Sequence, residues 1–205
     1  MKIGVIGAGN IGATLAALLA AAGHEVMISN SRGPESLAGL VAELGPRVRA
    51  GTAPEAAVFG ELVIEAIPFG RYRSLPAGEL AGKILVTAAN YYPARDGQIA
   101  LGGRAQSELI AAYLPQTRVA KAFNTIWYQH LANQGDTSLP MDKRRVIFLA
   151  GDDVAAKAVV AGLIEQLGFG PLDTGSLAGS TVQEPGTPIY NVDLTVNEAR
   201  QIVDG

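Results

Sequence analysis

The sequence predicts an α/β fold: a doubly wound, mostly parallel sheet covered by helices, with a small C-terminal extension packed on it. Short apolar runs alternate with longer segments of helical composition along the chain. The N-terminus has the order strand, glycine turn and helix, which is typical of this class. With 205 residues, 48% of them hydrophobic, the chain is long enough for one large domain and too short for a full second one.

The first element contains a glycine motif. An apolar run over residues 3–6 precedes Gly7-x-Gly9-x-x-Gly12, and the Ala/Leu-rich segment Ile11–Ala22 that follows has high helix propensity. Gly7 makes the tight turn, Gly9 lets a pyrophosphate approach the backbone, and Gly12 lets helix and strand pack closely. Unpaired N–H groups at the helix start favour phosphate. We therefore predict a Rossmann-type dinucleotide site with contacts from Gly7, Gly9, Asn10, Ile11 and Gly12.

The residues that follow the second predicted strand indicate which dinucleotide binds. Residues 25–29 (EVMIS) read as a strand, and a helix is expected from Glu35 to about Leu44. A protein that binds NAD usually carries Asp or Glu at this strand end to hold the ribose 2′-hydroxyl. Here Asn30, Ser31 and Arg32 stand instead, and a hydroxyl, a guanidinium and helix N–H groups suit a 2′-phosphate. The pattern predicts NADP(H); an ordinary helix cap with a solvated arginine is the alternative.

The middle of the chain supplies a third and a fourth strand, at residues 48–50 and 62–67, with a helix over 52–59 capped by Thr52 between them. The fourth strand stops at a proline and an aromatic residue. In open α/β sheets ligands bind at the carboxyl ends of the strands, so we expect cofactor contacts there from Ile67, Pro68 and Phe69. Glu65 lies within this apolar strand, as a base or a paired carboxylate, and is assigned no role.

The next strands are expected at residues 83–87 and 118–123, with a helix over 106–114 between them. Small residues and amides follow both strands, where close approach and hydrogen bonding to a nicotinamide are useful. We therefore assign the nicotinamide end of the site to Ala88, Asn90, Asn124 and Thr125.

The last third of the chain is expected to contact the second ligand. We predict an acceptor pocket formed by Trp127, Tyr128, His130 and Pro185. His130 is either a proton donor or a loop-anchoring residue, and no residue is expected to be an obligatory acid or base. The unpatterned segment 131–143 is typical of a lid or a binding wall. Late strands at 145–150 and 169–172, a helix at 154–167, a loop at 174–188 and a last helix at 195–203 complete the chain. We expect a single domain, with a dinucleotide-binding core (1–127) and an extension (128–205).

Composition narrows the classes of partner. The formal net charge is −3 and no Lys/Arg run occurs, which argues against nucleic acid or an anionic membrane as main partner. There is no cysteine and the two histidines are far apart, so disulfides, a thiol nucleophile and a metal site are not expected. The glycine-interrupted N-terminal segment is neither a signal peptide nor a membrane span. We expect a cytoplasmic protein.

Four motifs together resemble a known family: GxGxxG, the segment Asn30-Ser31-Arg32-Gly33-Pro34-Glu35, the strand end Ile67-Pro68-Phe69, and Lys121-Ala122-Phe123-Asn124-Thr125. Over approximately residues 1–172 the chain is similar to the coenzyme F-420-dependent NADP oxidoreductases, including the cytosolic reductase domain of the six-transmembrane epithelial antigen metalloreductases. The resemblance implies an NADP(H)-binding Rossmann domain, hydride exchange with a flavin-like second substrate such as F-420, FMN or FAD, and commonly a homodimer. The membrane-spanning part of the metalloreductases has no counterpart in this sequence.

The function expected from these residues is direct hydride transfer between NADP(H) and a flavin or deazaflavin. Such transfer needs two rings held together rather than a catalytic triad or a metal. Two alternatives remain. One is a NADP(H)-binding sensor or regulatory protein without turnover, because the cofactor alone does not establish chemistry. The other is a reductase of a small imine or hydroxy acid, a class that appends a helical domain of about 100 residues, whereas only about 40 to 60 remain here.

Overall fold

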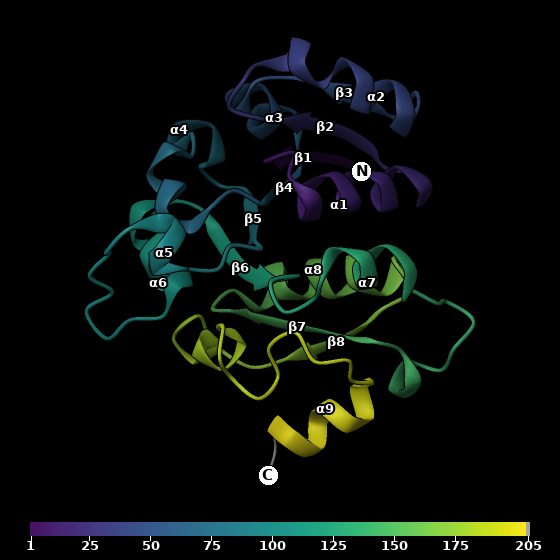
Figure 1. Ribbon diagram of the computed structural model, residues 1–205, viewed down its shortest axis with the longest axis vertical. Coiled ribbons are helices and arrows are strands. Elements are labelled where there is room, and N and C mark those ends of the chain that lie inside the picture. The colour runs from purple at the N-terminus through teal and green to yellow at the C-terminus, as the bar shows by residue number, and fades with distance from the viewer. Residues whose placement is uncertain (204–205) are drawn as a thin grey trace.

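The computed structural model describes residues 1–203, which form an eight-stranded sheet in the order β3-β2-β1-β4-β5-β6-β7-β8 (Figure 1). Neighbouring strands are parallel except β6 and β7, which are antiparallel. The fold is thus the predicted Rossmann-like, mostly parallel sheet, and each predicted strand forms. The strands are β1 (Lys2–Ile6), β2 (Glu25–Ser29), β3 (Val48–Ala50), β4 (Leu62–Glu65), β5 (Ile84–Thr87), β6 (Arg118–Ala122), β7 (Val146–Gly151) and β8 (Gly170–Asp173).

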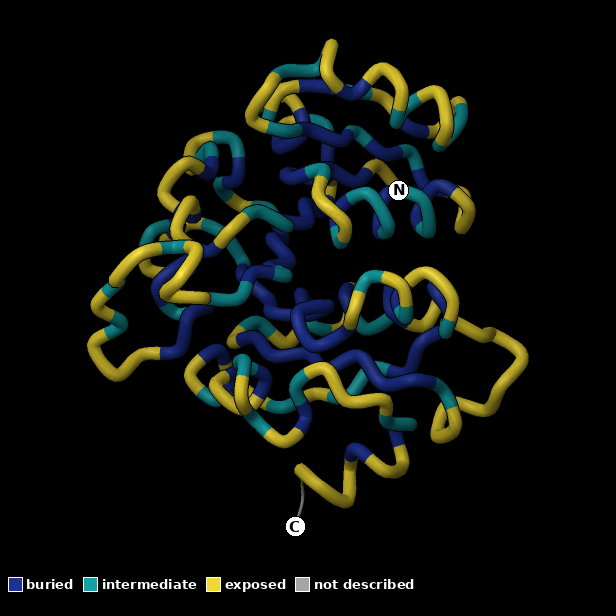
Figure 2. The backbone as a smooth tube through the Cα atoms, in the orientation of Figure 1, coloured by how far each residue is buried: buried dark blue, intermediate teal, exposed yellow. Residues whose placement is uncertain are grey.

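Helices cover both faces of the sheet. On one face a buried apolar cluster joins side chains of β1, β2, β4 and β6 to helices α1 (Asn10–Ala21), α2 (Ala38–Leu44), α7 (Tyr128–Asn133) and α8 (Val154–Gln166). On the other face a second cluster joins the strands to α3 (Ala53–Phe59), α4 (Ala77–Leu80), α6 (Gln106–Tyr113) and the 3-10 turn η2 (Phe69–Ser74). Figure 2 shows the result, a buried set of strands surrounded by exposed loops and helix faces.

The last part of the C-terminal extension packs against its own late strands, β7 and β8. Val146 and Phe148 of β7 pack with Ile189 and with helix α9 (Val196–Val203) in a third, smaller core. The intervening segment contains the 3-10 turn η4 (Ala178–Gln183) and returns toward the centre of the sheet, where the Asn191 N–H donates to the Thr125 carbonyl at 3.0 Å. Residues far apart in sequence therefore meet beside β6.

Three predictions for the segments between the strands need correction. The helix expected from Glu35 to Leu44 is divided into a 3-10 turn, η1 (Pro34–Leu37), and α2, with the turn beginning at a proline that fixes φ. The two ends of the segment 131–143 belong to α7 and to the turn η3 (Met141–Lys143), and the loop between them is limited to residues 134–140. The loop expected at 174–188 contains η4. A further short helix, α5 (Pro93–Asp96), was not predicted, because one turn is too short to show periodicity.

The strand order places the site. The chain runs outward from β1 to β3 and then returns to the other side of β1 with β4. At such a reversal the carboxyl ends of the two central strands open a crevice, because the following loops leave in opposite directions. Within the described residues, no helix combines the length and the apolar character needed to cross a membrane.

Candidate functional site

The turn after β1 has the geometry of a phosphate-binding loop. Gly7 has φ +112° and donates its N–H to the Ser29 carbonyl at 2.9 Å. A Cβ at Gly12 would overlap the carbonyl oxygen of Gly7, so close packing of helix and strand requires glycine there. A Cβ at Gly9 would instead meet nothing within 4 Å. No described side chain caps the first turn of α1. Open space and uncapped N–H groups fit a pyrophosphate.

The loop after β2 presents Ser31 and Arg32 to solvent beside this turn. The Asn30 Oδ1 accepts from the Arg32 N–H at 2.9 Å, and its Nδ2 donates to the Ser36 Oγ at 2.9 Å. These bonds form a compact Asx turn. Arg32 is exposed and makes no ion pair with any residue of the range 1–203. The guanidinium is thus available for an anion.

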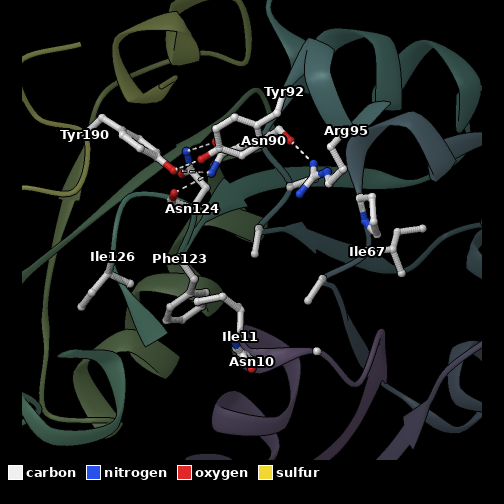
Figure 3. Close-up of a pocket in the computed structure, with 15 residues that line it drawn as sticks. Asn10, Ile11, Ile67, Asn90, Tyr92, Arg95, Phe123, Asn124, Ile126 and Tyr190 are labelled. Atoms are coloured by element: carbon white, nitrogen blue, oxygen red, sulfur yellow. Dashed lines mark hydrogen bonds between the residues drawn. The ribbon is translucent and has the colours of Figure 1, made fainter. Parts of the chain in front are cut away.

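A cavity of about 350 Å³ opens at the carboxyl ends of β1, β4, β5 and β6 (Figure 3). It begins at the glycine turn and extends to the C-terminal extension. Several predicted cofactor residues line it: Gly9, Asn10, Ile11, Ile67, Pro68, Ala88, Asn90 and Asn124. Residues that sequence reasoning did not place in the site also line it: Ala66, Ala89, Tyr92, Arg95, Phe123, Ile126 and Tyr190.

One wall of the cavity is polar and closely bonded. The Asn90 Nδ2 donates to the Asn124 carbonyl at 2.7 Å and to the Tyr190 hydroxyl at 3.3 Å. The Asn124 Nδ2 donates to the Asn90 Oδ1 and to the Gln183 carbonyl. The hydroxyls of Tyr92 and Tyr190 are hydrogen-bonded to each other. Figure 3 shows these side chains grouped on one side and Ile126, Phe123 and Ile11 on the other. The C-terminal extension therefore completes the polar wall.

Two charged or phenolic groups in this wall are constrained by their neighbours. Burial and the hydrogen bond with Tyr92 raise the pKa of the Tyr190 hydroxyl above its ordinary range, so this group stays protonated. Arg95 lies 5.1 Å from the centre of the Tyr92 ring and is paired with Asp96 at 2.8 Å. Its guanidinium also donates to the Asn90 carbonyl at 2.6 Å. Arg95 consequently acts mainly as a clamp between α5 and the strand-end loop.

The turn after β6 is strained. Phe123 is fully buried and has φ +63°, a conformation that a bulky residue rarely adopts. Such a backbone costs about 1–3 kcal/mol and persists where surrounding contacts hold it. Here the bond from Asn90 to the Asn124 carbonyl holds the turn. The strain lies at the cavity and directs the Phe123 ring into its lining.

A row of polar side chains lies in the sheet directly behind the cavity. Glu65, Thr87 and Lys121, here called the buried row, are in-register neighbours on β4, β5 and β6 and are at most 1% exposed. The Thr87 hydroxyl donates to the Glu65 Oε2 at 2.6 Å, and the Ile67 N–H donates to the Glu65 Oε1 at 3.0 Å. Burial raises the pKa of Glu65 to about 7 and lowers that of Lys121 to about 8.

The remaining predicted residues lie outside the cavity lining. Gly7 and Gly12 shape the turn, and Asn30, Ser31 and Arg32 lie on the neighbouring loop. Phe69 is buried against Tyr72, with ring centres 5.2 Å apart, because its side chain points into the core behind η2. Thr125 is buried and its carbonyl accepts from Asn191.

The predicted acceptor residues gather at the start of α7. Trp127 is 45% exposed and stacks edge-on against both Tyr128 and His130. The His130 Nδ1 is 2.9 Å from an Asp193 carboxylate oxygen. Neither these three residues nor Pro185 lines the cavity, whereas their neighbour Ile126 does. No group of three or more metal-ligating side chains gathers in the part of the chain that the structure describes.

Known proteins are similar to this chain in sequence and in fold. Residues 2–91 match the family described as NADP oxidoreductase, coenzyme F420-dependent. A hypothetical protein from Sinorhizobium meliloti is 36% identical, with a TM-score of 0.83 over 95% of each chain. A putative F420-dependent NADP reductase from Arthrobacter sp. FB24 is 29% identical, with a TM-score of 0.74 over 95% of this chain and 99% of that one.

Two further likenesses cover less of the other protein. Metalloreductase STEAP3 from Rattus norvegicus is 34% identical over 184 residues, which are 87% of this chain and 35% of the relative. The chain thus spans about a third of the length of the curated relatives it matches. An imine reductase from Pseudomonas sp. is 21% identical, with a TM-score of 0.64 over 86% of this chain and 57% of that one, a likeness that shows the fold alone.

Proposed function

We propose that this chain, whose residues 2–91 match the family of coenzyme F420-dependent NADP oxidoreductases, passes hydride directly between NADP(H) and a flavin or deazaflavin ring. The observation that carries the proposal is the cavity, which starts at the phosphate-binding turn and ends at a wall supplied by the C-terminal extension. Its position supports a nicotinamide near Pro68, Ala88, Asn90 and Asn124, with the acceptor toward Ile126 and Tyr190. NADPH, when bound there, would supply the hydride.

The side chains of the cavity suit direct transfer. Two rings that exchange hydride must be held with their reacting carbons within about 3–3.5 Å and away from water. Ile11, Ile67, Phe123 and Ile126 provide an apolar surface for this, and the amides of Asn90 and Asn124, bonded to each other, provide a fixed polar wall facing it. Neither task requires a proton to move.

Preference for NADP(H) over NAD(H) is assigned to the loop after β2. Asn30 holds the loop through its bond to the Arg32 N–H, and the loop carries no carboxylate at the strand end. The exposed Ser31 hydroxyl and the Arg32 guanidinium are partners for a 2′-phosphate.

A second function is favoured by one observation, the hydrogen-bonded hydroxyls of Tyr92 and Tyr190 in the cavity wall. A hydroxyl beside a nicotinamide is a proton donor for a small imine or carbonyl substrate.

The deciding experiment is stopped-flow oxidation of NADPH that carries deuterium at C4. F420, FMN, FAD and riboflavin are offered separately, followed by a panel of small imines and of 3-oxo acids, the oxidised partners of 3-hydroxy acids. Direct transfer predicts a slower rate with the deuterated cofactor and, with F420, deuterium retained on the deazaflavin carbon. Reduction of an imine alone would assign the second function. Tight NADPH binding with no turnover of any acceptor would indicate a sensor and contradict the proposal.

We also propose a homodimer that acts in the cytoplasm, and an internal division at residue 127 between a dinucleotide-binding core and the extension that lines the acceptor side. The family resemblance supports the dimer, and Tyr190 in the cavity supports the division. Sedimentation velocity over a concentration series checks the assembly; a monomer at every concentration would contradict it.

A further inference from the structure

The buried row has no part in the proposed hydride transfer, although it is the most unusual feature of the sheet interior. Charged side chains are almost never fully buried unless they are paired. Here the Glu65 carboxylate on β4 and the Lys121 ammonium on β6 are buried on either side of Thr87 on β5. All three residues lie near the strand ends that border the cavity. Isolated charges in such a place are costly, so their presence calls for a function.

Each member of the buried row is bonded to backbone that forms the cavity. The Glu65 carboxylate accepts from the N–H of Ile67, and the Lys121 ammonium donates to the carbonyl of Ala89 at 3.4 Å. The Thr87 hydroxyl accepts from the Ala89 N–H at 3.3 Å. Ile67 and Ala89 both line the cavity. The two charges are therefore bonded directly to backbone groups of residues that line the space assigned to the nicotinamide.

The other charged groups near the row are already engaged. Glu184 faces Lys121, and its carboxylate accepts from the Gln106 N–H at 2.9 Å. Arg95 faces Glu65 and is paired with Asp96. Water does not reach the row to screen it, so its charges act on nearby groups more strongly than surface charges would.

We propose that the buried row sets the relative affinity of the site for NADP⁺ and NADPH. The two forms differ by a positive charge on the nicotinamide ring. The Glu65 carboxylate favours the positively charged ring, and the Lys121 ammonium disfavours it. Thr87 carries no charge; its hydroxyl bonds the Glu65 carboxylate and the Ala89 N–H and so holds Glu65 and the Ala89 turn in place.

The test compares dissociation constants at pH 7.5, where the Glu65 carboxyl is mainly ionised and the Lys121 amine mainly protonated because of their pKa values of about 7 and about 8. Calorimetric titrations measure NADP⁺, NADPH and 2′,5′-ADP, which lacks the nicotinamide. Glu65→Gln should raise the ratio Kd(NADP⁺)/Kd(NADPH) and Lys121→Met should lower it, each by about three- to tenfold. A tenfold change corresponds to about 30 mV in the potential of the bound couple. Binding of 2′,5′-ADP should not change.

Matched controls are available beside the amino ends of β4 and β5. Glu61→Gln and Lys83→Met remove the same charges next to the amino ends of β4 and β5, far from the cavity, and should leave the ratio unchanged. Thr87→Val removes the hydroxyl without a change of charge and should weaken NADP⁺ and NADPH equally. Opposite shifts in the two charge variants cannot come from a loosened fold, which would weaken both forms together.

An unchanged ratio, or a shift of the same sign in both charge variants, would overturn the inference. If Lys121→Met does not fold, Glu65→Gln and its control decide the question, since the ratio must still rise. The inference rests on the proposed function only in placing the nicotinamide in this cavity. Wild-type protein that binds neither form would contradict the cofactor site itself. Normal binding without turnover of any acceptor would contradict the proposed hydride transfer but not the buried row's role. Binding without a ratio shift would contradict only the buried row's role.

Discussion

At the scale of single residues, Arg32 is the first to test. Arg32→Ala should weaken NADPH binding by roughly 10- to 150-fold, because a hydrogen bond to a charged group is worth about 1.5–3 kcal/mol. NADH has no 2′-phosphate, so its binding should barely change. Fluorescence titration with both cofactors measures the difference.

The control for Arg32 is Arg47→Ala. Arg47 is exposed before β3, at the opposite end of the same part of the sheet, where its guanidinium reaches the Gly23 carbonyl. It should leave both cofactors unaffected. Equal losses for NADPH and NADH in Arg32→Ala would show that the loop does not hold a 2′-phosphate.

Two glycines of the first turn should respond differently to alanine. Gly9 has an ordinary φ of −78° and open space at its Cβ position, so Gly9→Ala should fold with nearly wild-type stability. The added methyl would occupy the space assigned to pyrophosphate, and NADPH affinity should fall at least tenfold. Gly12→Ala should instead destabilise the protein by about 2–4 kcal/mol, because its Cβ overlaps the Gly7 backbone. Urea unfolding and NADPH titration of both variants separate the effects. Unaltered NADPH binding in Gly9→Ala would place the phosphates elsewhere.

At the scale of elements, the row that links β4, β5 and β6 makes stability depend on pH. The pKa of Glu65 is about 7 in the folded protein against an ordinary 4.5. Between these values the folded state binds the proton more tightly than the unfolded state does, so this group's contribution to stability falls as pH rises and is constant above pH 7. Glu65→Gln does not titrate. Its stability relative to wild type should therefore rise between pH 4.5 and 7, by at most about 3 kcal/mol.

Urea unfolding at pH 5 and pH 7.5 checks this expectation, with Glu61→Gln as the control for net charge. Lys121 acts in a separate window, because its lowered pKa affects stability only above about pH 8. A stability difference between Glu65→Gln and wild type that is the same at both pH values would contradict the account.

The elements also show what the sequence could predict. Buried parallel strands appear as apolar runs, and helices of two or more turns show composition and caps, such as the Thr52–Glu55 capping box that opens α3. Single-turn helices such as α5 have no period to detect. The residue type at position 123 does not indicate its positive φ, because a hydrogen bond from Asn90 on another loop holds this turn.

At the scale of the whole molecule, cofactor binding should be visible as stabilisation of the entire fold. The cavity draws residues from four strand ends and from the C-terminal extension, so a ligand there joins all of them. NADPH at 100 times its dissociation constant should add about 2.7 kcal/mol to the free energy of unfolding. For a chain of this length that raises Tm by about 5–10 °C.

Differential scanning fluorimetry measures this shift. NADH at the same concentration should give a much smaller shift in Tm. In Arg32→Ala, NADPH and NADH should give Tm shifts of similar size. Equal shifts with NADPH and NADH in the wild type would contradict the assigned preference.

The molecule as a whole also explains which site residues escaped sequence reasoning. Tyr190 lies 68 residues after the end of β6 at Ala122. It reaches the cavity only because β7 reverses direction and the extension folds back. Tyr92 and Arg95 lie at and within a one-turn helix, and the Tyr92 hydroxyl is bonded to Tyr190 of that same extension. Local patterns predict strand ends, whereas contacts made through chain reversal need the tertiary structure.

Pro171 in β8 limits how two copies of the chain can pair through the edge of the sheet. The N–H groups of Gly170 and Thr174 point toward β7, donating to Arg145 and Leu149, so the backbone nitrogen of Pro171 faces the open edge of the sheet. A proline nitrogen carries no hydrogen and gives an incoming strand nothing to bond there. The opposite edge, β3, offers a strand of only three residues. Short edges and an edge proline both discourage strand-to-strand aggregation. Two copies that assemble would therefore meet through helices and loops, and the sheet would not continue from one copy into the next.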